Sequence, residues 1–229
     1  MFHFIHFMSL ISFCYALSID DNTNKPIMLF NELYSDKEWE LLDSDNDLSV
    51  YTKSINNKNL KAVMVKQELA LPKDVLQDVI MDIGNYKNFL RNSKSFVSIE
   101  INKTDTFTDG YQFIPIDIPF FDNREYIFRM LPSGYIKEDN TSIIHWFLLD
   151  KDDALLDSDG NSATYIDYGA GLWIAEQKEQ DKTLFSYSIY MDPGGSLPDF
   201  LIDLINKTSV INIFKDAISE AQKRHSKSY

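Results

Sequence analysis

Residues 171–205 read GLWIAEQKEQDKTLFSYSIYMDPGGSLPDFLIDLI, and this is the most informative stretch of the chain. It contains two strand patterns separated by a turn-forming Asp-Lys pair, followed by a tight loop and a helix. In the loop, Pro193 ends the second strand, and Gly194 and Gly195 tolerate positive φ. The next serine is a suitable N-cap for a helix whose early turn contains Pro198. The stretch therefore predicts a sharp reversal from a strand into a helix.

The helix after this loop is the longest helical pattern in the chain and runs from Leu197 to Lys223. Its apolar residues recur at helical spacing opposite a charged side, at positions 201, 204, 205, 211, 214, 218 and 221. Such a stripe is too wide for a surface helix that contacts only one neighbour. We therefore expect part of this helix to face a bound ligand.

Two short helices are expected in the first half of the chain. Ser35 and Glu38 have the capping-box spacing, which predicts a helix over residues 36–42 with its Trp and Leu side chains facing inward. The second helix has Pro72 in its first turn, and its apolar residues recur at helical spacing up to Gly84.

The remaining elements are expected to be strands. They cover residues 48–55, 60–69, 96–101, 111–116, 124–131, 143–149, 165–175 and 183–191. Turn-forming residues separate them, among them Asp109-Gly110 and Pro132-Ser133-Gly134. A helix, two strands, a helix, a run of antiparallel strands and a long terminal helix make up the element order of an α+β helix-grip fold. In that fold a twisted antiparallel sheet wraps around the C-terminal helix, and the space between them can stay unfilled.

The stretch at 171–205 resembles the START (StAR-related lipid-transfer) domain family, particularly its exported bacterial form. The matching residues are Gly171 and Trp173 on one strand, Thr183 and Tyr187 on the next, and the run DPGGSLP that ends at Pro198.

Further matches extend roughly from Glu38 to Ala221. They are Trp39-Glu-Leu with Leu48-Ser-Val-Tyr51 for the opening of the family, Asp82, Tyr86 and Phe89 for its D-x-x-x-Y-x-x-W segment, and PFFDNR at 119–124 for its P-(x)-R-(D/E) approach to a central strand. The chain departs from the pattern with Phe89 in place of Trp and with Glu125 in place of the commoner Asp. The resemblance implies a lipid-binding domain.

Binding residues are expected on the strands that face the terminal helix. Alternation along REYIFRML puts Arg124, Tyr126 and Phe128 on one face. An arginine at the end of an apolar tunnel can hold a ligand's hydroxyl, carbonyl or phosphate, and the alternative is an arginine paired with Glu125 or Asp122 at a sheet edge. The expected lipid-binding residues are Arg124, Tyr126, Phe128, Trp146, Trp173, Tyr187, Leu201, Leu204 and Ile205. Ordinary core packing is the alternative for each aromatic residue.

The terminal helix is expected to act as a lid, with Pro193, Gly194, Gly195 and Pro198 as its hinge. The expected function is non-catalytic carriage, transfer or sensing of a single phospholipid, fatty acid or sterol. Two alternatives remain open. One is an enzyme of the polyketide cyclase/dehydrase type on the same fold, and the other is an interaction module whose cavity is filled by its own side chains.

Composition limits the partners and the chemistry. A net charge of −13 without a Lys/Arg cluster argues against nucleic acid and allows only transient membrane contact. Outside the N-terminal run the histidines are His145 and His225, and the single cysteine, Cys14, lies inside that run. The chain therefore has almost no residues from which a catalytic relay or a His- or Cys-based metal site could be built. We expect no catalytic residue, no metal, no cofactor and a monomeric protein.

The N-terminal residues 2–17, FHFIHFMSLISFCYAL, form one apolar run that ends at a polar segment. The run is short for a bilayer span, and small residues at Ala16 and Ser18 suit a signal peptidase. We expect a signal peptide over residues 1–18, export from the cytoplasm, and one domain over residues 25–229. Because histidines precede the apolar core where Lys or Arg is usual, an uncleaved membrane anchor is the alternative.

Overall fold

The computed structural model describes residues 21–45, 47–55, 60–90, 97–116, 121–132, 140–151, 163–179, 182–194 and 199–227, with the side chains of 21–25 and 199–206 excepted. The expected signal peptide lies outside the described residues. The helices are α1 (Asp21–Tyr34), α2 (Lys73–Met81), α3 (Tyr86–Phe89) and α4 (Asp199–Ser226), and a 3-10 turn, η1 (Ile83–Asn85), joins α2 to α3. The strands are β1 (Glu40–Asp45), β2 (Leu48–Ser54), β3 (Lys61–Leu69), β4 (Val97–Lys103), β5 (Thr108–Ile114), β6 (Asn123–Pro132), β7 (Thr141–Leu148), β8 (Ala163–Tyr165), β9 (Gly169–Glu179) and β10 (Lys182–Met191).

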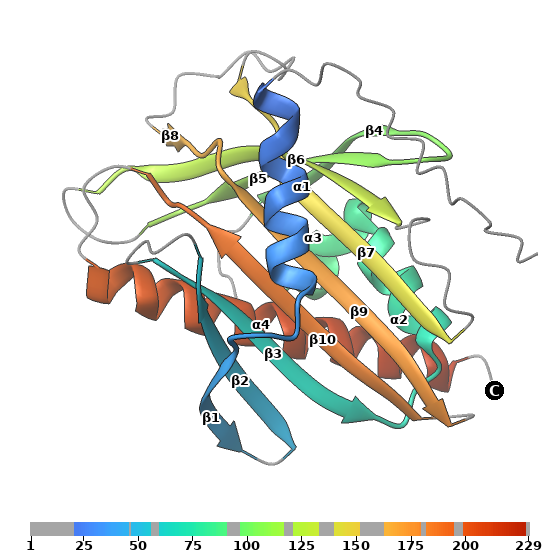
Figure 1. Ribbon diagram of the computed structural model, residues 1–229. Helices are drawn as coiled ribbons and strands as arrows, with labels where there is room; N and C mark the ends of the chain where they lie inside the picture. Colours follow the sequence, from blue (N-terminus) through green and yellow to red (C-terminus); the bar gives the residue numbers. More distant parts are fainter. Residues whose placement is uncertain are drawn as a thin grey trace, which may run out of the picture.

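The strands form one twisted sheet in the order β1-β2-β3-β10-β9-β7-β6-β5-β4. The pairs along this order are antiparallel, whereas β8 adds a short parallel pairing to β6. The β3–β10 pairing joins the first hairpin to the last strand, so the sheet is continuous. Helix α4 crosses one face of the sheet together with α2 and α3, and α1 lies on the opposite face over β7, β9 and β10 (Figure 1). The α+β helix-grip architecture expected from the sequence is confirmed.

Helix α4 is attached to the inner face of the sheet by stacked aromatic rings. Phe214 is fully buried, and its ring centroid lies 5.1 Å from Phe185 and 6.3 Å from Trp173. Removing a buried phenylalanine side chain of this kind costs about 3–5 kcal/mol. The middle of α4 is therefore a firm part of the core.

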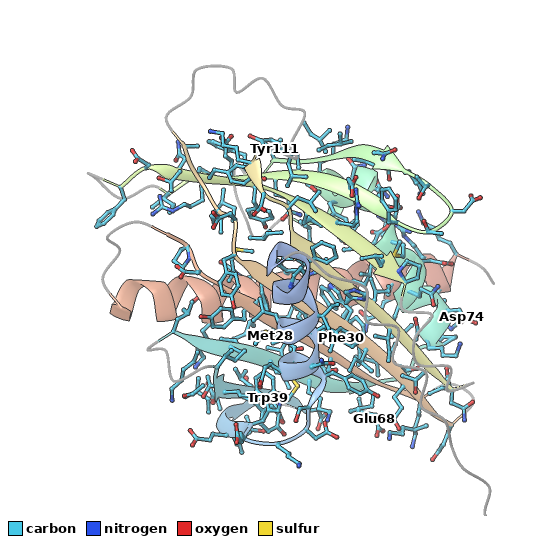
Figure 2. The ribbon with its side chains drawn as sticks, turned by 45° about the horizontal axis from the view of Figure 1, so that its top comes forward. Met28, Phe30, Trp39, Glu68, Asp74 and Tyr111 are labelled. Carbon is cyan, nitrogen blue, oxygen red and sulfur yellow. The ribbon has the colours of Figure 1, made fainter. Side chains whose placement is uncertain are left out.

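The outer layer corrects the expectation for the N-terminal part of the chain. Helix α1 was not expected, yet its Leu29 and Leu33 are buried against the outer face of the sheet. Figure 2 shows Phe30 on this helix and Trp39 beyond its end. The helix predicted over residues 36–42 is wrong: Glu38 has φ of 68°, and strand β1 follows with Leu42 exposed.

Two features of the strands also differ from expectation. Asp109-Gly110 is not a turn but part of β5, where a Cβ on Gly110 would lie 2.5 Å from the Phe128 ring. Glycine is needed there because the aromatic ring occupies the space of a side chain. The strand expected over residues 165–175 is two strands, since the chain leaves β8 at Tyr165 and enters β9 at Gly169.

The other helices agree with expectation within a few residues. The long terminal helix begins at Asp199 and ends at Ser226, and Pro72 is the N-cap of α2. Within the described ranges, no helix has both the length and the apolar composition that crossing a membrane requires.

Candidate ligand cavity

A cavity of about 120 Å³ lies between the inner face of the sheet, the α2–α3 segment and α4. Its wall is almost entirely apolar or aromatic. The described lining residues are Ile80, Tyr86, Phe89, Leu90, Gln112, Ile114, Ile116, Arg124, Tyr126, Phe128, Met130, Trp146, Ile166, Trp173, Tyr187, Ile189, Met191, Pro193, Ser209, Val210, Ile213 and Ala217.

Strand β6 supplies one side of the cavity through its alternation. Arg124, Tyr126, Phe128 and Met130 all line the cavity, as the period of two predicts for one face of a strand. Neighbouring Arg129 points to the other face, where its guanidinium pairs with Asp109 at 2.8 Å.

Three neighbouring strands supply the aromatic wall. Trp173 on β9 stacks on Tyr187 of β10 with ring centroids 3.7 Å apart, and Trp146 on β7 packs edge-on against Phe128. Gly171 makes room for Trp146, because a Cβ at that position would lie 2.4 Å from the indole ring. The conformation of the indole is thus set by a glycine on the next strand.

Arg124 contacts the loop before α4. The residue is 4% exposed. Its Nε donates to the Pro193 carbonyl oxygen at 2.7 Å, and its Nη2 donates to the Gly194 carbonyl oxygen at 3.2 Å. Its Nη1 donates to the carbonyl oxygens of Asp122 and Asn123. Backbone carbonyls rather than carboxylates therefore occupy this guanidinium. Burial lowers the pKa of Arg124, the nearby Asp122 acts in the opposite direction, and arginine stays charged.

The loop itself has the left-handed turn that the sequence predicts. Gly194 has φ of +62°, and its N–H donates to the Asp192 carboxylate at 3.1 Å. Gly195 and Pro198, the other expected hinge residues, lie outside the described residues.

The polar atoms of the cavity wall lie mainly on aromatic and amide side chains. The Tyr126 hydroxyl donates to Gln112 Oε1, and the Gln112 amide nitrogen lies 3.4 Å from Ser98 Oγ. The Tyr86 hydroxyl donates to the Ile80 carbonyl oxygen. Burial raises the pKa of Tyr86, Tyr126 and Tyr187, so all three are neutral phenols.

The structure brings most of the expected binding residues together. Arg124, Tyr126, Phe128, Trp146, Trp173 and Tyr187 all line the cavity. The side chains of Leu201, Leu204 and Ile205 lie outside the described residues. Among those described, the next turns of α4 contribute Ser209, Val210, Ile213 and Ala217.

Sequence reasoning missed Gln112 as a cavity residue. It lies on the same face of β5 as Gly110 and Ile114, and a lone polar amide in a predicted strand gives no signal for an apolar cavity wall. Tyr86 was identified as a match to the family pattern. Its place in the cavity depends on the docking of α3, which no local pattern shows.

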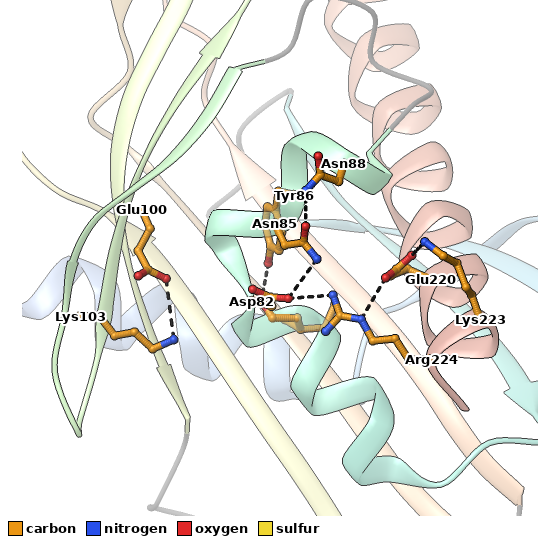
Figure 3. Close-up of polar contacts among 10 residues, drawn as sticks. Asp82, Asn85, Tyr86, Asn88, Glu100, Lys103, Glu220, Lys223 and Arg224 are labelled. Carbon is orange, nitrogen blue, oxygen red and sulfur yellow. Dashed lines mark hydrogen bonds and ion pairs between the residues drawn. The ribbon is translucent and has the colours of Figure 1, made fainter. Parts of the chain in front are cut away.

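Ion pairs attach the C-terminal end of α4 to the α2–α3 segment (Figure 3). Arg224 Nη2 lies 2.7 Å from Asp82 Oδ2, and Arg224 Nε lies 3.0 Å from Glu220 Oε1. Asn85 also donates to Asp82, at 3.3 Å. This end of α4 is therefore tied to the same segment that supplies Ile80 and Tyr86 to the cavity.

Comparison with solved structures identifies the fold. A STAR-related lipid transfer protein from Xanthomonas axonopodis superimposes with a TM-score of 0.66 and 20% identity, over 81% of this chain and 99% of that one. Human StAR-related lipid transfer protein 5 superimposes with a TM-score of 0.69 and 14% identity, over 89% of this chain and 96% of that one. An aromatase/cyclase from a Streptomyces species superimposes with a TM-score of 0.51 and 11% identity, over 71% of this chain and 94% of that one. No family profile and no curated protein matches the sequence. The chain has the START-domain fold, on which both lipid-transfer proteins and a cyclase are built.

Proposed function

We propose that this chain, folded as a START domain, binds one hydrophobic molecule in its cavity and carries, transfers or senses it without chemical change. The observation that carries the proposal is the cavity itself, a largely apolar space lined by the sheet, the α2–α3 segment and α4. Each buried methylene group of a ligand contributes about 0.8 kcal/mol, so a long apolar chain gains enough free energy to leave water. Similarity to proteins that are named for lipid transfer supports the same function.

The volume of the cavity is small compared with that of a lipid. An apolar cavity of about 150 Å³ accommodates one benzene ring, so the present 120 Å³ accommodates only part of a lipid. Loading then requires the walls to separate. Because the sheet is continuous, the covering helix α4 is the element that moves.

The attachments of α4 indicate where it opens. Its C-terminal end is tied to Asp82 through Arg224, and the loop at its start is held by Arg124. Gly194, already at positive φ, can change its backbone angles at little steric cost. We therefore expect the middle and the C-terminal end of the helix, held by Phe214 and Arg224, to stay in place while its N-terminal part opens next to the loop.

A catalytic function of the cyclase type would require a proton donor or acceptor in the cavity whose pKa is near the working pH. The described lining offers neutral tyrosines with raised pKa values and an arginine engaged by backbone carbonyls. These groups favour binding over catalysis.

The proposal extends to location and assembly. We propose that the protein is exported behind residues 1–18, acts as a monomer, and contacts membranes only while it exchanges ligand. N-terminal sequencing of the protein recovered outside the cytoplasm tests the export; a start at Met1 on a membrane-bound protein would indicate the anchor instead.

Ligand transfer between vesicles tests the function. We expect the protein that begins at Ile19 to accelerate transfer of a fluorescent lipid between neutral donor and acceptor vesicles and to protect one probe molecule per chain from water. Substituting the buried cavity residue Met130→Arg puts a charge into the apolar space and should abolish the effect. Folded protein with neither binding nor transfer would refute the proposal.

A further inference from the structure

Hydrogen-bonding side chains in the cavity gather around one pair of residues, Gln112 on β5 and Tyr126 on β6. The two are 8% and 5% exposed, and the hydroxyl of one donates to the amide oxygen of the other. The hydroxyls of Tyr86 and Tyr187 lie near enough to interact electrostatically with Tyr126. One part of an otherwise apolar wall is therefore polar.

This polar part of the wall is electrically neutral. An amide does not ionise, and burial raises the pKa of the tyrosines far from neutrality. Arg124 is the one charged residue among the described lining residues, and four backbone carbonyls accept its N–H groups. A carboxylate or phosphate bound at Gln112 and Tyr126 would lose its hydration and gain only neutral hydrogen-bond partners there, which is unfavourable.

The pair can still bind a neutral oxygen. Among the described residues, the Gln112 amide nitrogen has one partner, Ser98 Oγ at the long distance of 3.4 Å, although an amide carries two N–H groups. The Tyr126 oxygen donates its hydrogen to Gln112 and keeps lone pairs that can accept. A ligand hydroxyl can thus accept from Gln112 and donate to Tyr126, and a ligand carbonyl can accept.

We propose that the cavity selects a neutral lipid with a single hydroxyl or carbonyl oxygen, such as a long-chain alcohol or a sterol, and that Gln112 and Tyr126 bind this oxygen. This inference rests on the proposed binding function and narrows it. It distinguishes such ligands from fatty acids and phospholipids, whereas the sequence alone does not distinguish among these classes of lipid.

A series of ligands with one chain length tests the selection. Hexadecane, hexadecanol and hexadecanoate compete against a hydrophobic fluorophore at neutral pH, below their aggregation limits. We expect hexadecanol to bind about tenfold more tightly than hexadecane, the value of one to two net hydrogen bonds, and hexadecanoate to bind more weakly than hexadecanol.

Two variants assign the effect to the polar pair. Tyr126→Phe should weaken hexadecanol about tenfold and leave hexadecane unchanged. The Tyr126→Phe variant leaves the Gln112 amide oxygen without its hydrogen-bond donor. A double variant, Tyr126→Phe with Gln112→Met, removes both partners and is therefore measured as well. The matched control is Tyr190→Phe, which removes a buried hydroxyl from the outer face of the sheet and should change neither affinity.

The outcomes separate this inference from the proposed function. If none of the three ligands displaces the fluorophore from folded protein, the binding function itself fails. If hexadecanoate binds as tightly as hexadecanol, or if hexadecanol keeps its advantage over hexadecane in the double variant, binding stands and the selection for a neutral oxygen is overturned.

Discussion

Replacing Arg124 by alanine should accelerate ligand exchange, because this side chain holds the loop from which α4 begins. Two charge-assisted hydrogen bonds cross to that loop, 2.7 Å long to Pro193 and 3.2 Å long to Gly194. Bonds of this kind contribute about 1.5 kcal/mol or more each. Arg124→Ala should therefore lower the free energy of unfolding by about 3 kcal/mol, and the Tm by about 6–12 °C for a domain of this size.

The loss of these two hydrogen bonds should also make it easier for α4 to open. If α4 opens only when both bonds break, their removal lowers the cost of opening by about 3 kcal/mol and accelerates transfer by up to about a hundredfold. Affinity for a charged and for an uncharged ligand should fall equally, because backbone carbonyls already occupy the guanidinium. Stopped-flow transfer of a fluorescent lipid measures the rate.

Arg129→Ala is the matched control. Arg129 lies on the same strand and also makes a charge-assisted contact, to Asp109 at 2.8 Å, but on the opposite face. It should lower the Tm without changing the rate of transfer. If Arg124→Ala melts at a lower temperature and yet transfers lipid at the parent rate, Arg124 is only structural and the opening lies elsewhere.

Three further results are expected. Gly171→Ala should lower the free energy of unfolding by about 1–3 kcal/mol and weaken ligand binding, because its Cβ would lie 2.4 Å from Trp146. The control Gly84→Ala, whose Cβ would lie 3.9 Å from its nearest atom, should change neither quantity. Denaturation and binding experiments on the two variants measure both effects. Burial tends to raise the pKa of Glu220, but hydrogen bonds from neighbouring basic residues lower it overall. The stabilisation that ionised Glu220 provides above its ordinary pKa should therefore be lost as the pH falls below about 4.5. Glu220→Gln should remove that part of the acid unfolding curve. Burial lowers the pKa of His145, so the folded state should lose stability as the pH falls below about 6.5, and a Tm that is equally pH-dependent in His145→Gln would contradict this assignment.

Local patterns were sufficient where local chemistry decides the structure. The reversal after β10 follows from Pro193 and Gly194, whose backbone preferences act without tertiary help. The alternation of β6 correctly placed Arg124, Tyr126 and Phe128 on one face, because a strand has a period of two in any environment.

Local patterns failed where a partner distant in sequence decides. Helix α1 begins with polar residues and contains Pro26, so it has a weak helical signal, and packing of Leu29 and Leu33 against the sheet stabilises it. Gly110 resembled a turn residue although it is there to accommodate Phe128. Two of the four backbone carbonyls that Arg124 contacts lie on a loop about 70 residues away, and a carbonyl has no signature in the sequence.

The mass of the native protein shows directly whether the cavity holds a ligand. The protein should be purified without detergent from the cells that produce it, and measured by native mass spectrometry before and after organic extraction. We expect one neutral, oxygen-containing lipid bound per chain, released on extraction and absent from the Met130→Arg variant. A folded protein that shows only the mass of its own chain, and whose extract contains no hydrophobic molecule, would contradict the claim that this cavity holds a ligand.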